Sequence, residues 1–132
     1  MKKLLFIILT CLSLVSNMAY ASDNNTINKA YHTKQSDIQV QGVGKVIKIL
    51  RDDNNGTRHQ KFLVKLPSNL TILIAHNIDL SNRIEDLRVD DTIEFYGEYE
   101  WNKKGGVIHW THHDPRKKHK DGWLKYNGII YQ

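Results

Sequence analysis

The fold is decided by residues 38–50, which read IQVQGVGKVIKIL. Apolar and polar residues alternate over much of this stretch, as expected for a strand with one buried face. Gly42 and Gly44 lie inside it, and glycine within a strand usually marks a bulge or a sharp bend. Because the first strand of a small barrel needs such a bend, this stretch predicts a β-barrel of few strands.

Four more strands and one short helix are predicted downstream. The strands are expected at His59–Leu66, Leu70–His76, Thr92–Trp101 and Val107–His112. Between the third and fourth strands, Leu80, Ile84 and Leu87 have the i, i+4, i+7 spacing of a helix face. Asp79 and Ser81 are the candidate caps of this helix. The predicted fold class is all-β with one short helix, a five-stranded OB-fold-like barrel. Another half-open β-barrel or a β-sandwich is the alternative.

The C-terminal residues predict a β-hairpin that is added to this barrel. Trp123–Tyr126 and Ile129–Tyr131 are two short strand-like segments, joined by Asn127 and Gly128. An Asn-Gly pair suits a type I′ turn, which matches the twist of a two-stranded hairpin. We expect the hairpin to cover an edge or an open end of the barrel.

Residues 1–21 read MKKLLFIILTCLSLVSNMAYA and have the three parts of an export signal. Lys2 and Lys3 form a positive start, residues 4–15 are an apolar run, and residues 19–21 form an A-x-A cleavage site. The apolar run is shorter than the ~20 residues that a transmembrane helix needs. These features predict a periplasmic or secreted protein whose mature chain begins at Ser22.

Removal of the signal changes what the composition implies. The chain has 132 residues with a formal net charge of +5, and loss of two lysines makes the mature domain only mildly basic. Cys11 is the only cysteine, so the exported domain has no disulfide, thiolate nucleophile or cysteine metal ligand. Residues 22–37 are polar without periodicity and are expected to form a flexible N-terminal arm. The OB-fold-like domain is expected over residues 38–132.

Alternation along the fourth and fifth strands predicts a polar outer face. Core positions are expected at Ile93, Phe95, Ile108 and Trp110. Outward positions are expected at Glu94, Tyr96, Glu98, Glu100, His109, Thr111 and His113. A four-residue turn over residues 102–105 pairs Trp101 with Gly106, and therefore Glu98 with His109, Tyr96 with Thr111, and Glu94 with His113. Directly opposed side chains have Cβ atoms ~5 Å apart, so carboxylates are expected beside imidazoles.

Such a face suggests acid–base chemistry. The candidate catalytic residues are Glu98, His109, His113 and Asp114, because a carboxylate raises the pKa of a neighbouring histidine and fixes its tautomer. The reaction expected from this group is hydrolysis by a nuclease or phosphodiesterase. A divalent metal is a further option, although His109 and His113 would lie ~13 Å apart along an extended strand. The alternative interpretation is a set of cross-strand ion pairs on a solvated sheet.

Basic and aromatic residues suggest ligand binding instead. OB-folds bind polymers across strands two and three, between the first and fourth loops. The candidate ligand-binding residues there are Arg51, Arg58, Lys61, Lys65, Trp101, Lys103 and Lys104. Single-stranded nucleic acid is the first candidate partner, since cations contact phosphates and aromatic rings stack on bases. Acidic polysaccharide is the second, and docking of a protein partner through Tyr96 and Trp101 is a third interpretation.

Four stretches of sequence carry a resemblance to a known family. They are residues 75–80 (AHNIDL), 97–102 (GEYEWN), 105–115 (GGVIHWTHHDP) and 121–124 (DGWL). With these, the chain resembles a family of short exported bacterial proteins catalogued as a domain of unknown function, family 3465. The resemblance covers roughly residues 42–132. It implies a bacterial envelope or secreted protein and brings no catalytic role with it.

Overall fold

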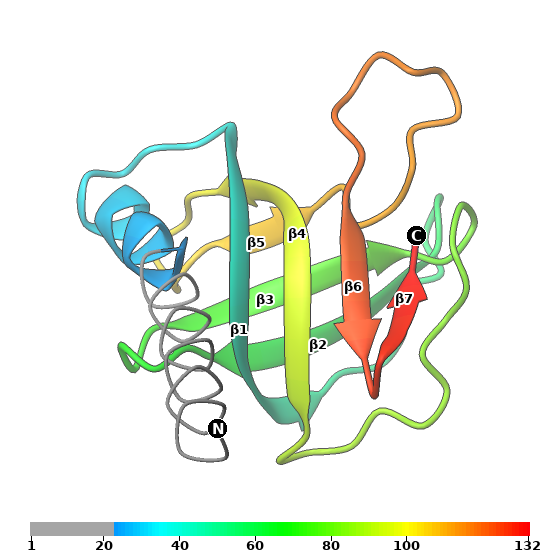
Figure 1. Ribbon diagram of the computed structural model, residues 1–132, viewed down its shortest axis with the longest axis horizontal. Helices are drawn as coiled ribbons and strands as arrows, with labels where there is room; N and C mark the ends of the chain where they lie inside the picture. The colour runs from blue at the N-terminus through cyan, green and yellow to red at the C-terminus, as the bar shows by residue number, and fades with distance from the viewer. Residues whose placement is uncertain (1–22) are drawn as a thin grey trace, which may run out of the picture.

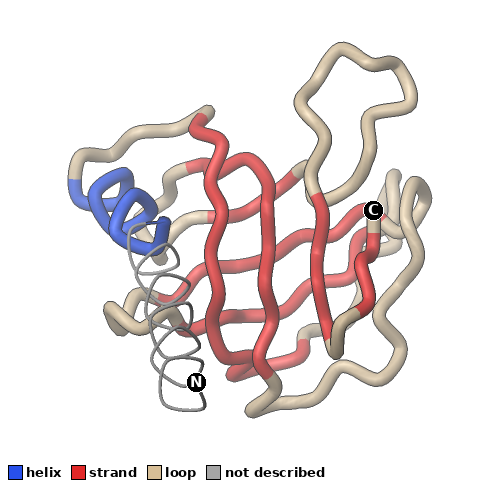
Figure 2. The backbone as a smooth tube through the Cα atoms, in the orientation of Figure 1, coloured by secondary structure: helices blue, strands red, loops and turns tan. Residues whose placement is uncertain are grey.

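Five strands close into a barrel in the computed structural model, which describes residues 23–132 (Figures 1 and 2). The sheet of the described residues has seven strands in all. They are β1 (Ile38–Ile49), β2 (His59–Lys65), β3 (Thr71–Asn77), β4 (Thr92–Glu100), β5 (Val107–His109), β6 (Trp123–Tyr126) and β7 (Ile129–Tyr131). Their order is β1-β2-β3-β5-β4-β6-β7, and an additional β1–β4 pairing closes the first five. The predicted OB-fold-like barrel is confirmed, and within it β3 pairs in parallel with β5.

The bend in β1 lets this strand pair with both β4 and β2. Its first part pairs with β4, its last part pairs with β2, and Lys45 pairs with Thr92 on one side and Lys65 on the other. The ladder with β2 shifts register between Val46 and Lys48. The predicted bend is therefore confirmed, with the irregularity just after Gly44. A side chain at Gly44 would collide with β2, which explains the absence of a Cβ there.

The C-terminal hairpin extends the barrel wall rather than closing one of its ends. β6 pairs antiparallel with β4, and β7 lies at the outer edge of the sheet (Figure 1). Asn127 and Gly128 both have positive φ, at 50° and 76°, as a type I′ turn requires. The predicted hairpin and its turn are confirmed.

A helix occupies residues 23–32, where the sequence predicted a flexible arm (Figure 2). Ile27 and Ala30 on this helix are buried in the core, and the Asn24 side chain accepts a hydrogen bond from the Val43 backbone. The arm prediction was wrong for these residues, because two apolar residues three apart give too short a pattern to reveal a helix in the sequence alone. The predicted export signal, residues 1–21, lies outside the described residues. Within residues 23–132, no helix has the length and apolar character to cross a membrane.

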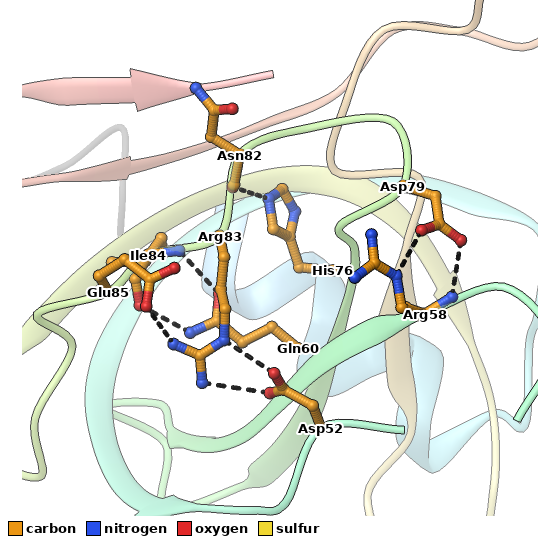
Figure 3. A network of polar contacts seen from close by, with 9 residues as sticks. All are labelled: Asp52, Arg58, Gln60, His76, Asp79, Asn82, Arg83, Ile84 and Glu85. Atoms are coloured by element: carbon orange, nitrogen blue, oxygen red, sulfur yellow. Dashed lines mark hydrogen bonds and ion pairs between the residues drawn. The ribbon is translucent and has the colours of Figure 1, made fainter. Parts of the chain in front are cut away.

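The segment between β3 and β4 is irregular, so the short helix predicted there was wrong. Ile84 and Leu87 are buried as the pattern required, while Leu80 is 45% exposed. Side chains hold this segment in place of helical hydrogen bonds (Figure 3). The Gln60 amide donates to the Ile84 carbonyl and accepts from the Ile84 N–H, and Arg83 pairs with Asp52 at 2.8 Å.

His76 ties the same segment to the loop that follows β5. It is fully buried. Its Nε2 lies 3.0 Å from the Asn82 carbonyl oxygen (Figure 3), and its Nδ1 lies 2.7 Å from the Thr111 hydroxyl. Because a carbonyl only accepts, Nε2–H donates to it, and Nδ1 accepts from the hydroxyl in the neutral ring. Burial lowers the pKa of His76 to about 4. His76 therefore stays neutral and holds two loops together.

Candidate functional site

The register of β4 against β5 is the one predicted from the four-residue turn. Glu98 pairs with His109, and Glu100 pairs with Val107. The ladder ends at His109, because Trp110 adopts a left-handed φ of 58°. β6 then takes the place of β5 beside β4. The site therefore begins where β5 stops.

Four predictions about the residues after His109 were wrong. Thr111 is buried instead of outward, and Trp110 is partly exposed instead of in the core. The expected Tyr96–Thr111 and Glu94–His113 pairs are replaced by Tyr96–Trp123 and Glu94–Lys125. The left-handed turn at Trp110 is the physical cause, because it reverses which side of the backbone the next side chains face.

Glu98 contacts a histidine that the strand pattern did not identify. The Glu98 carboxylate lies 3.2 Å from Nε2 of His119, in the loop before β6. The His119 ring stacks on Trp110 at 4.0 Å between centroids and 5° between planes. Its Nδ1 lies 2.8 Å from the Lys120 carbonyl oxygen. Both ring nitrogens face oxygen acceptors, so contacts on two sides fix the orientation of the His119 ring.

His113 lies in the same loop, but its partner is a different carboxylate. It pairs with Asp121 at 3.0 Å, and both side chains are more than half exposed. Asp121 also accepts a hydrogen bond from the Asp114 N–H. This pair closes the base of the loop. It does not bring His113 to the other candidate catalytic residues.

Asp114 organises the loop through its carboxylate. Three backbone N–H groups donate to it, those of Arg116, Lys118 and His119. These hydrogen bonds, with that of His119 the largest cause, hold the pKa of Asp114 below its usual range. Its oxygens are therefore engaged with the backbone, and the sequence-based assignment of a catalytic role to Asp114 does not fit this geometry.

A cleft of about 420 Å³ opens on the outer face of β2, β3 and β5. Three histidines from different parts of the chain line it, His59, His109 and His112. Ala75 lies between β2 and β5 on this face and also lines the cleft. A methyl group there leaves room between the longer side chains of the flanking strands. The strand pattern identified His109 but missed His59, which shares the outward parity of Lys61 two residues later.

Backbone carbonyl groups fix the tautomer of two of these rings. Nδ1 of His59 lies 2.9 Å from the Thr57 carbonyl oxygen, and Nδ1 of His112 lies 2.7 Å from that of His113. Since a carbonyl only accepts, each Nδ1 carries a proton, and Nε2 is unprotonated in the neutral ring. The Nε2 of His59 is thus a proton acceptor in a ring that lines the cleft.

His109 has a different environment. Burial lowers its pKa, and this effect outweighs the opposing effects of Glu100 and Glu98. Its Nε2 lies 3.7 Å from a carboxylate oxygen of Glu100. Burial thus disfavours the protonated form of His109, while the nearby Glu100 carboxylate stabilises it.

The cleft continues at both ends, and we refer to the three adjoining hollows as the groove. A second hollow of about 230 Å³ shares His59 and His109 with the cleft and adds Lys61. A third, of about 540 Å³, meets the cleft at Trp110 and Leu80. Its wall includes Arg116, Lys118 and His119. Cationic side chains thus lie at both ends of the groove, with histidines and Trp110 between them.

Lys61 is the predicted ligand-binding residue that lines the groove. Arg58 is exposed and pairs with Asp79 at 2.7 Å (Figure 3), and Arg51 and Lys65 are exposed without lining any of the three hollows.

Trp101 packs near the N-terminal helix instead. Its Nε1–H donates to the Tyr31 carbonyl oxygen at 3.0 Å, and the Lys34 ammonium lies 5.6 Å from its ring centroid. Lys103 and Lys104 belong to the adjacent turn, where the Lys103 carbonyl oxygen accepts from the Tyr31 hydroxyl.

The described residues 23–132 contain one group of three metal-ligating side chains whose ligand atoms lie within 4.8 Å of one another. It consists of Asp37, Glu98 and Glu100. The cleft histidines are not part of this group.

Comparison with known proteins gives a family and no activity. The profile of a family described as "Protein of unknown function (DUF3465)" matches residues 7–132. No curated protein matches the chain. The resemblance drawn from the four sequence stretches is thereby confirmed. Because the match covers nearly the whole chain, this protein belongs to the DUF3465 family of proteins of unknown function.

Proposed function

We propose that this protein is an exported binding module whose groove holds single-stranded nucleic acid. The observation that carries the proposal is the order of side chains along the groove. Lys61 lies at one end, Arg116 and Lys118 lie at the other, and Trp110 lies between them. Cations that follow a phosphate backbone, together with an aromatic surface for bases, are the parts that such binding needs.

The acidic residues near the groove do not oppose this proposal as strongly as the sequence suggests. Glu98 is paired with His119 at 3.2 Å, and the Asp114 carboxylate accepts three backbone hydrogen bonds. Each carboxylate is thus compensated within the protein. Repulsion of a polyanion by these two groups is correspondingly reduced.

Binding is expected to be micromolar or tighter and to weaken steeply with salt, because phosphate contacts release counterions. Fluorescence anisotropy of a labelled single-stranded oligonucleotide at several salt concentrations measures this. Lys61→Ala is expected to weaken binding and to reduce the slope of log K against log salt by about one. Lys29→Ala is the matched control, because Lys29 is an exposed lysine of the N-terminal helix, outside the groove.

Two results would contradict the proposal. The first is wild-type protein that shows no salt-dependent binding of single-stranded DNA or RNA. The second is equal weakening by Lys61→Ala and Lys29→Ala, which would indicate general charge attraction. A labelled acidic polysaccharide is the competitor, and its preference over both nucleic acids would identify the other anionic polymer as the ligand.

Export is part of the same proposal. The charged start, apolar run and A-x-A site of residues 1–21 support it. Expression in a bacterial host followed by N-terminal sequencing of the periplasmic fraction tests it. We expect a mature chain that begins at Ser22, and a chain that keeps Met1 in the cytoplasm would contradict export.

A second candidate function is hydrolysis of a phosphodiester. The specific observation in its favour is that His59 and His109 line the same cleft. Two histidines beside a bound phosphate can act as a general base and a general acid. Lys61 lines the adjoining hollow with both of them and would offset the developing negative charge.

A further inference from the structure

We propose that the groove cleaves RNA, and not DNA, by internal transphosphorylation, with His59 as general base and His109 as general acid. This inference rests on the proposed binding of nucleic acid in the groove. To the second candidate function it adds a substrate class, RNA, a course for the reaction, and separate roles for His59 and His109.

The sheet register places the three polar groups close together. Lys61 pairs with Ala75 across β2 and β3. Ala75 follows Ile74, and His109 follows Ile108, which is the partner of Ile74 in the parallel β3–β5 ladder. Lys61 and His109 therefore flank Ala75 on one face. His59, two residues before Lys61, shares that face and lines both hollows with His109.

His59 is suited to accept a proton. Its Nδ1–H is engaged with the Thr57 carbonyl oxygen at 2.9 Å. The lone pair of Nε2 is therefore the group that can take a proton from a substrate hydroxyl. The carbonyl also stabilises the ring after it has been protonated, because Nδ1–H continues to donate to it.

His109 is suited to return a proton. Its Nε2 lies 3.7 Å from the Glu100 carboxylate, which stabilises the imidazolium. Burial has the opposite effect on the ring and makes that imidazolium a stronger acid than an exposed one. A donor of this kind releases its proton readily to a leaving alkoxide oxygen.

The arrangement favours an intramolecular nucleophile. Among residues 23–132, the cleft histidines do not belong to any group of three ligands within 4.8 Å, so the geometry does not offer a histidine-held ion to activate water. The 2′-hydroxyl of RNA is already positioned next to the phosphorus atom, and such proximity replaces much of the activation that an external nucleophile needs. DNA lacks this hydroxyl.

The reaction balances without a further reactant. The 2′-oxygen forms a bond to phosphorus while its proton passes to Nε2 of His59. The bond from phosphorus to the 5′-oxygen breaks, and that oxygen takes a proton from His109. The products are a 2′,3′-cyclic phosphate on one fragment and a free 5′-hydroxyl on the other. Lys61 faces the non-bridging oxygens, whose negative charge rises during attack.

The test uses a labelled DNA oligonucleotide that carries a single ribonucleotide, with an all-DNA oligonucleotide of the same sequence beside it. The purified protein is incubated with each in EDTA, and products are separated on a denaturing gel. We expect cleavage directly after the ribonucleotide, a 2′,3′-cyclic phosphate by mass spectrometry, and intact all-DNA strand. His59→Ala and His109→Ala should each lower the rate by about 100-fold or more.

His32→Ala is the matched control, because His32 is exposed on the N-terminal helix. It should keep the wild-type rate. Circular dichroism and binding of the all-DNA oligonucleotide report whether each variant is folded and still binds. Normal binding without cleavage by the wild type would overturn this inference and leave the binding proposal standing. Equal cleavage of the all-DNA strand, or full activity in both His59→Ala and His109→Ala, would overturn it as well. Absence of binding would remove both proposals.

Discussion

The protein is expected to lose about 3 kcal/mol of folding stability between pH 6.5 and pH 4 through one residue, His76. The pKa of this histidine is about 4 in the folded state, because burial penalises its charge, against 6.5 in the unfolded chain. Between these values the unfolded chain binds more protons, so acid favours unfolding. The contribution of His76 is complete above pH 6.5 and is lost as the pH falls to 4.

Urea unfolding at a series of pH values across this window measures the effect. His76→Gln should flatten the dependence, and His32→Gln, at an exposed site, should leave it unchanged. The lowered pKa of His109 acts in the same direction and leaves a smaller slope in the variant. Asp114 and Asp121 also have lowered pKa values, but the ordinary pKa of an aspartate carboxyl is 3.8, so their contribution is lost below this window. A slope that His76→Gln leaves unchanged would contradict the assignment.

The barrel could be predicted because its signals are local. Strict alternation along β4 placed Ile93 and Phe95 in the core, where both are fully buried. The glycine-containing turn before β5 set the register, and Glu98 indeed pairs with His109. Each of these inferences needed only strand periodicity and a loop length.

The one short helix was predicted in the wrong place, because periodicity alone does not specify backbone hydrogen bonding. Ile84 and Leu87 have helical spacing and are buried. Yet side chains from the barrel, such as that of Gln60, bond the backbone of their segment. In contrast, Ile27 and Ala30 anchor a helix to the core although the surrounding sequence is polar. Tertiary contacts decided both cases.

The candidate site was only half predictable for a similar reason. The left-handed conformation of Trp110 ends β5 early. The sequence does not predict this conformation, since a positive φ is uncommon for residues other than glycine. His119 therefore reaches Glu98 from a loop. The outward position of His59 could have been predicted from the sequence, because His59 has the same strand parity as Lys61 in β2.

Gly122→Ala is expected to destabilise the protein by about 2 kcal/mol and to weaken the groove at its basic end. A methyl group at this position would overlap the carbonyl oxygen of Trp110 and that of Tyr96. Both are backbone atoms, so neither can turn aside as a flexible side chain can. The Gly122 N–H also donates to the His112 carbonyl at 2.9 Å. The overlap therefore pushes the returning loop away from the strand on which it packs.

Loss of this packing should reach the ligand site through His119. The ring of His119 stacks on Trp110 at 4.0 Å and pairs with Glu98 at 3.2 Å, and a displaced loop would lose both contacts. We expect changed tryptophan fluorescence and weaker binding of single-stranded DNA by anisotropy. Gly128→Ala is the control, because no atom lies within 4 Å of a methyl group there and its positive φ is the only strain. It should cost about 1 kcal/mol and leave binding unchanged. If Gly122→Ala bound single-stranded DNA as tightly as Gly128→Ala, the loop would not form a wall of the binding groove. Arg116 and Lys118 would then not lie on the path of the phosphate backbone.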